Sequence, residues 1–209
     1  MHFVSRRVAC FCDNVFEADV PDSADLEAEP DVEKQIESGD FMALTCPNCG
    51  KRLTPEFPFR LSLRGGRGEL IMIPGKDMNG LIRGKLDYDI GRPFRVVVGF
   101  PEMAEKLYIL EAGLDDRIIE IMKYYLLTGA AGAEDQDRDV VLRYKGEQEG
   151  RHVFHVLGLK DGEIGVARLG DEIYRKIAQD VDARVKDEPF QDFCSPPWVS
   201  VRRLTGGDV

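Results

Sequence analysis

The sequence has no long apolar run, and this absence bears first on the membrane. Nowhere in its 209 residues does it approach the ~20 consecutive apolar residues of a membrane-spanning helix, so we expect no membrane segment. The first eight residues carry Arg6 and Arg7 without an apolar segment behind them, so we also expect no signal peptide. We therefore expect a cytoplasmic protein, in which thiols stay reduced.

The sequence also lacks the motifs of common enzymes. It contains no Gly-x-Ser-x-Gly, no His-Glu-x-x-His and no P-loop. His152 and His155 are three residues apart on an expected strand, where they point to opposite faces and cannot share a metal ion. Carboxylates are abundant, but abundance does not place them around a substrate. The sequence favours a non-enzymatic role and leaves an enzyme unsupported rather than excluded.

Four of the five cysteines form two pairs near the N-terminus. Cys46 and Cys49 lie in Cys-Pro-Asn-Cys-Gly, a turn that directs two sulfurs to one point, and Cys10 and Cys12 are separated by one residue. Four thiolates suit a closed tetrahedral zinc site, in which the metal has a structural role. Cys194 has no motif around it and is expected to be a small buried side chain.

The negative charge is concentrated between the two cysteine pairs. Segment 13–45 holds eleven acids and one base, Lys34, so the rest of the chain has 38 − 11 = 27 acids and 28 − 1 = 27 bases. The whole net charge of −10 therefore lies in this segment. A solvated acidic loop and helix is the simpler interpretation, and a docking surface for a basic protein partner is the alternative. Phosphate repulsion makes nucleic acid an unfavourable partner.

The first half of the chain shows short strands, one helix and a hairpin. Alternating apolar residues predict a hairpin with strands at 52–63 and 69–73 around the glycine-rich turn 65–68. Residues 31–38 form a helix that Ser38-Gly39 ends, and residues 74–93 form a long loop or irregular edge. Further strands are expected at 3–9, at 15–20 (ended by Pro21-Asp22), at 41–45 and at 94–100.

The second half combines helices with a small sheet. A helix from Pro101 to Gly113 is followed by one over 115–128, whose apolar stripe includes Ile118 and Met122 and leaves Lys123 exposed. Residues 130–139 read as a linker. Strands are then expected at 140–144, 152–157, 164–167 and 198–204, with one helix following Gly170 that carries Ile173, Ile177, Val181 and Val185.

These elements predict an α+β protein. Its N-terminal part is a zinc-ribbon-like β module with a helical insert, continued by a strand–helix–helix block, and a small α+β unit ends the chain. The linker places the boundary between domains 1–133 and 134–209.

The cysteine pairs, the intervening helix and the Cys-Pro-Asn-Cys-Gly turn resemble the CpXC-domain family, which is named for two Cys-Pro-x-Cys motifs. A further similarity is the block at 94–127. The first pair departs from the motif because Cys10-Phe11-Cys12 is one residue short and lacks proline. The resemblance implies a zinc-ribbon-like fold and assigns no biochemical activity.

Three functional hypotheses follow. The first is a zinc-stabilised interaction or scaffolding module, with zinc on Cys10, Cys12, Cys46 and Cys49 and a protein partner bound through segment 13–45. The second is a redox-responsive zinc switch or chaperone-like factor, because the cysteine arrangement resembles the zinc centre of a redox-regulated holdase family. The third is a nucleic-acid-binding regulator, suggested by a mild basic excess over residues 50–92.

Overall fold

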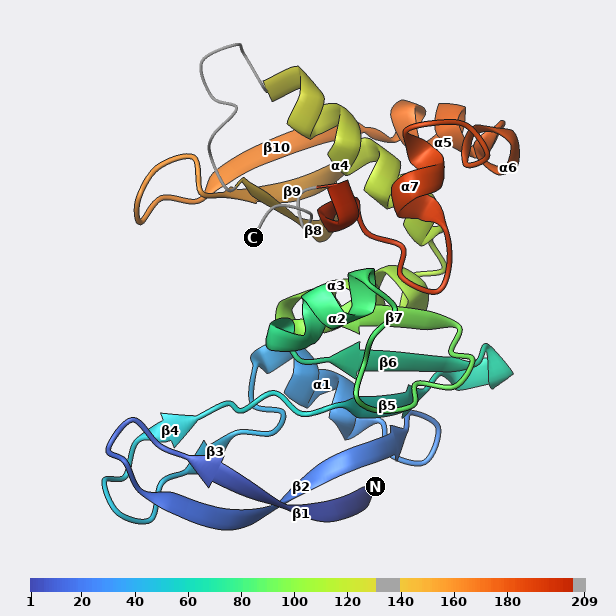
Figure 1. Cartoon of the computed structure of the whole chain (residues 1–209). Coiled ribbons are helices and arrows are strands. Elements are labelled where there is room, and N and C mark those ends of the chain that lie inside the picture. The colour runs from blue at the N-terminus through green and yellow to red at the C-terminus, as the bar shows by residue number, and fades with distance from the viewer. Residues whose placement is uncertain (131–139, 205–209) are drawn as a thin grey trace. The chain divides into compact units, whose positions relative to one another are not determined.

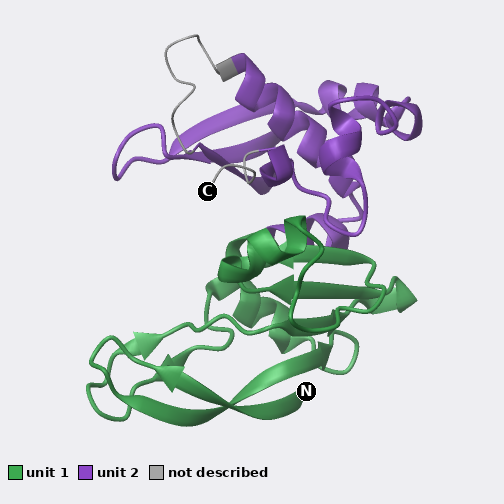
Figure 2. Cartoon of the chain, in the orientation of Figure 1, with its two compact units in different colours: residues 1–104 green, residues 105–209 purple. Residues whose placement is uncertain are grey.

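The computed structural model describes residues 1–130 and 140–204. These fall into two compact units, Met1–Ala104 and Glu105–Val209 (Figure 2). Both units combine helices and strands, which confirms the α+β class. The boundary predicted between 133 and 134 lies in 131–139, outside the described residues, and stays a prediction.

A mixed five-stranded sheet organises unit 1, in the order β1-β2-β5-β6-β7 (Figure 1). The pairs β1/β2 and β5/β6 are antiparallel, whereas β2/β5 and β6/β7 are parallel. Phe59 and Leu61 are buried in β5 while the intervening residues are half-exposed, which confirms the predicted alternation and hairpin. The first strand of this hairpin is limited to Phe59–Ser62 and does not extend over 52–63 as predicted. The strands are β1 (His2–Ala9), β2 (Val15–Asp25), β5 (Phe59–Ser62), β6 (Glu69–Ile73) and β7 (Arg95–Val98).

Strand β2 runs further than predicted, past Pro21-Asp22 to Asp25. Pro21 lies opposite Phe3, next to the point where the register between β1 and β2 shifts. Beyond it, Ser23–Asp25 pair with β5 on the other side of the strand. The parallel partner therefore continues the strand beyond the proline, which itself lacks a backbone N–H. Because β5 pairs only with this end of β2, β1 and β2 extend as a twisted two-stranded ribbon (Figure 1).

Short elements connect the strands of unit 1. Helix α1 (Asp31–Ser38) buries Val32 and Ile36 and ends at Gly39, whose φ of 73° is the left-handed conformation that favours glycine. This confirms the predicted helix. The strand expected at 41–45 is limited to β3, and the segment 74–93 contains a short helix. The elements are β3 (Leu44–Thr45), β4 (Arg52–Leu53), η1 (Arg64–Gly66), η2 (Gly75–Asp77) and α2 (Met78–Ile82).

Unit 2 packs helices against an antiparallel three-stranded sheet of order β10-β9-β8. Ile118 and Met122 of α4 are buried in a core with Phe154 of β9, which confirms the predicted apolar stripe. The elements are α3 (Gly99–Glu111, which begins in unit 1), α4 (Asp116–Ala130), β8 (Val141–Gln148), β9 (Arg151–Leu157), β10 (Gly165–Gly170), α5 (Asp171–Ala178), α6 (Val181–Arg184), α7 (Phe190–Cys194) and η3 (Val201–Leu204).

Two predictions for the C-terminal part are wrong. The single helix expected after Gly170 is interrupted, because the N–H groups of Ala183 and Arg184 bond to the carbonyl of Asp180 and start a separate turn, α6. The strand expected at 198–204 is irregular and ends in the 3₁₀ turn η3. Its backbone groups at Val199 and Val201 bond to buried side chains instead of a neighbouring strand. No helix among the described residues is long and apolar enough to cross a membrane.

Candidate metal centre

The first cysteine pair lies in the turn that joins β1 to β2. The N–H of Cys10 donates to the carbonyl of Asn14 at 2.9 Å, and the N–H of Asp13 donates to the carbonyl of Cys10 at 3.0 Å. Asp13 has φ 62°, a left-handed conformation that aspartate tolerates better than most residues. This compact turn brings the sulfurs of Cys10 and Cys12 together despite the missing residue and the missing proline.

The second pair lies in the equivalent turn between β3 and β4. The N–H of Cys46 donates to the carbonyl of Lys51 at 2.9 Å, and the N–H of Gly50 donates to the carbonyl of Cys46 at 3.0 Å. Gly50 has φ 70°, so glycine allows the chain to turn back beneath the sulfurs. Both pairs are therefore held by short hairpins.

The four sulfurs meet at one place. Cys10 Sγ lies 3.6 Å from Cys49 Sγ, and Cys12 Sγ lies 3.8 Å from Cys46 Sγ. All four lie within 4.8 Å of one another. A tetrahedron with metal–sulfur bonds of about 2.3 Å has sulfur–sulfur edges of about 3.8 Å, whereas a disulfide needs about 2.05 Å. The cluster therefore fits a metal ion. Coordination by these four cysteines stays a prediction.

Packing and polar groups differ around the four sulfurs. Cys10 and Cys46 are buried with Val8 and Leu53, whereas Cys49 is exposed. Two asparagine amides also point at sulfur. Asn14 Nδ2 donates to Cys46 Sγ at 3.8 Å, and Asn48 Nδ2 donates to Cys12 Sγ at 3.6 Å. Sequence reasoning missed these donors, although each asparagine lies within two residues of a cysteine. Such N–H groups stabilise thiolate, the form that binds metal.

The thiol pKa values differ accordingly. Burial raises the pKa of Cys46, but backbone N–H groups of Cys49 and Asn48 outweigh it and lower the pKa to about 6. The backbone N–H of Asn14 and the amide of Asn48 also lower the pKa of Cys12. For Cys10, a bond from the Cys12 backbone lowers the pKa, but burial and the neighbouring thiols raise it to about 12. Metal binding therefore has to displace the most tightly held proton from Cys10.

Cys194 lies apart from this cluster in the sequence, on α7 of unit 2. It is buried, as predicted, and its Sγ donates to the carbonyl of Arg117 at 3.8 Å. Burial, followed by the carboxylates of Glu120 and Asp116, raises the pKa of this thiol to about 12. Such a thiol stays protonated and unreactive, which fits a packing role.

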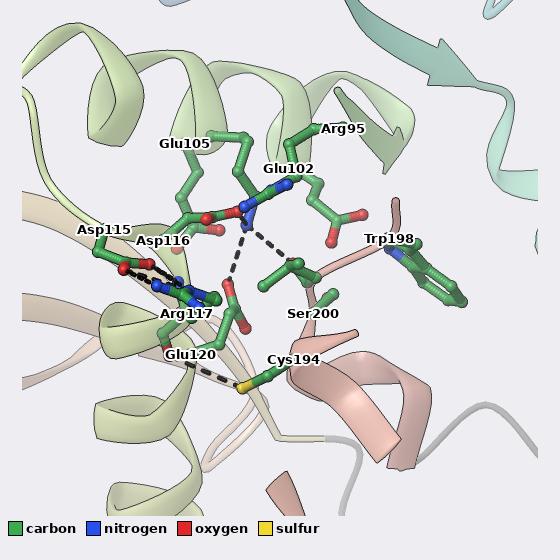
Figure 3. A network of polar contacts seen from close by, with 12 residues as sticks. Arg95, Glu102, Glu105, Asp115, Asp116, Arg117, Glu120, Cys194, Trp198 and Ser200 are labelled. Carbon is green, nitrogen blue, oxygen red and sulfur yellow. Dashed lines mark hydrogen bonds and ion pairs between the residues drawn. The ribbon is translucent and has the colours of Figure 1, made fainter. Parts of the chain in front are cut away.

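Unit 2 contains a second polar cluster that sequence reasoning missed. Six ionisable residues of α3 and α4 are at most 6% exposed, and five of them belong to unit 2: Glu105, Lys106, Asp116, Glu120 and Lys123. Figure 3 shows the three acids among these helices. Lys106 Nζ donates to Asp116 at 2.9 Å and to the carbonyl of Val199 at 2.8 Å. The prediction that Lys123 is exposed is therefore wrong.

The cluster keeps its charges because they are paired. Lys123 Nζ lies 2.6 Å from Glu105 and 2.8 Å from Glu120. Burial lowers the pKa of Lys123, but these two carboxylates outweigh it and raise the pKa. The carboxylates also accept hydrogen bonds from the backbone. Glu120 accepts from the N–H of Val201 at 2.8 Å, and Glu105 accepts from the backbone N–H of Tyr144 at 2.5 Å. The cluster thus fixes the C-terminal segment and strand β8, and its arrangement indicates a structural role.

The histidines also have separate surroundings. His152 is buried, with its ring nitrogens 2.9 Å from the Tyr144 hydroxyl and 3.3 Å from an Asp171 oxygen. His155, three residues later in the same strand, is partly exposed.

These features define a class: an α+β protein with a four-cysteine cluster that fits a metal ion. The model of the family described as CpXC protein matches residues 8–123, which include all four cysteines. The chain therefore belongs to the CpXC family, as its motifs predicted. It is also similar to a protein of Treponema pallidum (strain Nichols) described as uncharacterized, with 23% identity over 190 residues covering 83% of this chain and 87% of that protein. No solved structure matches the chain.

Proposed function

We propose that the chain is a zinc-stabilised interaction module, in which Cys10, Cys12, Cys46 and Cys49 hold one zinc ion in a zinc-ribbon arrangement. The observation that carries this proposal is the convergence of four Sγ atoms from two hairpin turns. Four thiolates fill a tetrahedral site and leave no position for a substrate, so the metal cross-links the turns. Coordination by thiolates requires reduced cysteines, so we propose a reducing compartment, the cytoplasm.

The proposed docking surface is a row of acids on β2 and the preceding turn. Asp13, Glu17 and Asp19 are exposed, and none of them forms an ion pair within the described residues. Arg7 lies opposite Glu17 in the register and offsets one of the three charges. The row is fixed to the cysteine turn, so it presents carboxylates at set positions to a basic partner. We call Asp13, Glu17 and Asp19 the acidic row.

Other acids of segment 13–45 have partners inside unit 1. Glu33 pairs with Arg64 at 2.7 Å, Asp40 pairs with Arg52 at 2.5 Å, and Glu29 pairs with the chain's N-terminal amine. Their charge is partly neutralised, so they offer less to an external partner. The contacts therefore narrow the proposed interface from the whole acidic segment to the acidic row.

Affinity capture from the native host tests this role. The double variant Glu17→Gln/Asp19→Asn should lose partners that the wild type retains at low salt, because it loses carboxylates needed for complementarity. Glu37→Gln is the matched control, since Glu37 is an exposed acid of α1 without an ion pair in the described residues. Retention of the same partners by the double variant would show that the acidic row serves solubility instead.

A second candidate is a redox-responsive, chaperone-like factor, which the exposure of Cys49 favours. Its sulfur lies 3.6 Å from that of buried Cys10, so an oxidant can reach one member of a close pair. Two zinc thiolates would give two electrons to hydrogen peroxide and form a disulfide, while the peroxide takes two protons from solvent and leaves as two water molecules, and zinc is released. Reversible zinc release at stoichiometric peroxide, followed with a chromogenic chelator, supports this candidate. Retention of zinc under these conditions supports the structural role.

A further inference from the structure

Strand β10 forms one edge of the three-stranded sheet of unit 2. It pairs antiparallel with β9, and among the described residues it pairs with no other strand. The open side of an edge strand presents backbone N–H and C=O groups that an added strand can bond. Proteins use this geometry to bind extended peptides, which take affinity from the backbone and specificity from alternate side chains.

The side chains of β10 alternate between the core and solvent. Ala167 and Leu169 pack against the core of unit 2. Val166 lies on the opposite face and is 48% exposed, and Ile164, just before the strand, is 57% exposed. These two apolar side chains occupy alternate positions next to the open edge, so they can contact alternate side chains of an added strand.

Two arginines continue this face. Arg168 follows Val166 at the next outward position, and Arg151 of β9 lies opposite Gly170 on the same face. Both are exposed, and neither guanidinium group forms a hydrogen bond or ion pair in the part of the chain that the structure describes. Together with Gln148 and Glu149 they line an open depression of the surface. Unpaired guanidinium groups bind carboxylates through two parallel hydrogen bonds.

We propose that Ile164, Val166, Arg168 and Arg151, here called the β10 surface, bind an extended acidic and apolar peptide segment of a partner protein. The segment lies along β10, where apolar residues at alternate positions contact Ile164 and Val166. One or two carboxylates at the adjoining end contact the arginines. This binding site is separate from the proposed metal module, because it contains no cysteine and lies wholly in unit 2.

Charge favours a short peptide over nucleic acid at this surface. Residues 105–209 hold 21 acids and 15 bases, so unit 2 itself has a net charge of −6, which repels polyanions. Glu149 also lines this depression beside the arginines and limits the negative charge that can be accommodated there. A segment with one or two carboxylates and an apolar part satisfies both the basic end and the apolar end of the β10 surface.

Peptide display against the full chain, followed by fluorescence anisotropy with the selected peptides, tests the proposal. We expect selection of peptides that carry two apolar residues at alternate positions beside aspartate or glutamate. Val166→Lys and the double variant Arg151→Gln/Arg168→Gln should each weaken binding by about tenfold or more, the size expected for losing a central contact. Unchanged melting temperatures confirm that both variants fold.

Val15→Lys is the matched control, because Val15 is a strand valine with 49% exposure on the other sheet, and its binding should match the wild type. A selection that yields no acidic and apolar peptides, or peptides that bind the β10 variants as tightly as the wild type, overturns the proposal. Short single-stranded oligothymidine serves as a second probe. Binding of this DNA that is lost in the double arginine variant assigns the surface to nucleic acid and also overturns the proposal.

Discussion

The cysteine turns of unit 1 and the charged cluster of unit 2 both bury polar groups, but their apolar surroundings differ. The sulfurs pack in a small apolar cluster, in which Val8 and Leu53 are buried and Phe16, Ala18, Leu44 and Phe57 are partly buried. The core of unit 2 joins α4 to the sheet and the C-terminal helices and includes Ile119, Phe154 and Phe193. A small apolar cluster contributes little to stability, so we propose that a metal ion cross-links the two cysteine turns.

The charged cluster of unit 2 positions backbone segments and adds little net stability. Burying Lys106, Lys123 and three acids costs desolvation energy, which their mutual pairing only partly offsets. The cluster fixes the position of the C-terminal segment, because its side chains bond to specific backbone groups at Val199 and Val201. We infer that metal binding stabilises the two cysteine turns of unit 1. In unit 2 the buried charges fix the position of segments that the apolar core of that unit already stabilises.

The largest difference should appear on removal of one thiolate. Cys46→Ser should unfold the ribbon while unit 2 stays folded, because metal binding at small sites supplies about 10–16 kcal/mol of apparent free energy. Hydrogen exchange measured by mass spectrometry resolves peptides from the two units. Faster exchange in residues 1–53 with unchanged exchange in α4 is the expected pattern, and equal protection of both regions in the variant contradicts the comparison.

Removal of a buried charge from unit 2 should have the next largest effect on stability. Lys123→Ala leaves Glu105 and Glu120 buried with less compensation, so we expect a loss of about 3–5 kcal/mol of unfolding free energy. Lys34→Ala is the control, because the Lys34 side chain is 81% exposed and its pair with Asp31 contributes little. Urea unfolding measures both. A Lys123 variant as stable as the control would mean that the cluster is dispensable.

The acidic segment should contribute least to stability. Glu17→Gln and Asp19→Asn remove exposed charges without an ion pair in the described residues and should change stability by less than about 0.5 kcal/mol. Glu33→Gln removes the partly buried pair with Arg64 and should cost up to about 1 kcal/mol. Thermal melting at matched salt compares them, and a larger loss from the first two would mean that the acidic row supports the fold.

The sequence predicted the cysteine cluster because turn chemistry is local. The Cys-Pro-Asn-Cys-Gly motif specifies its own hairpin, and α1 and the β5–β6 hairpin follow from short-range patterns in the same way. Lys123 could not be placed from the sequence, since its partner Glu105 lies on another helix. The false strand at 198–204 has the same origin, because its backbone partners are side chains distant in sequence.

Metal analysis of protein purified without added metal tests the central claim most directly. We expect one zinc per chain in a colourless protein, because zinc thiolate sites have no d-electron absorption. Cys194→Ser should keep this ratio, since Cys194 is buried in unit 2, and Cys49→Ser should lower it. A ratio near zero, iron in place of zinc, or full zinc content in Cys49→Ser would contradict the account.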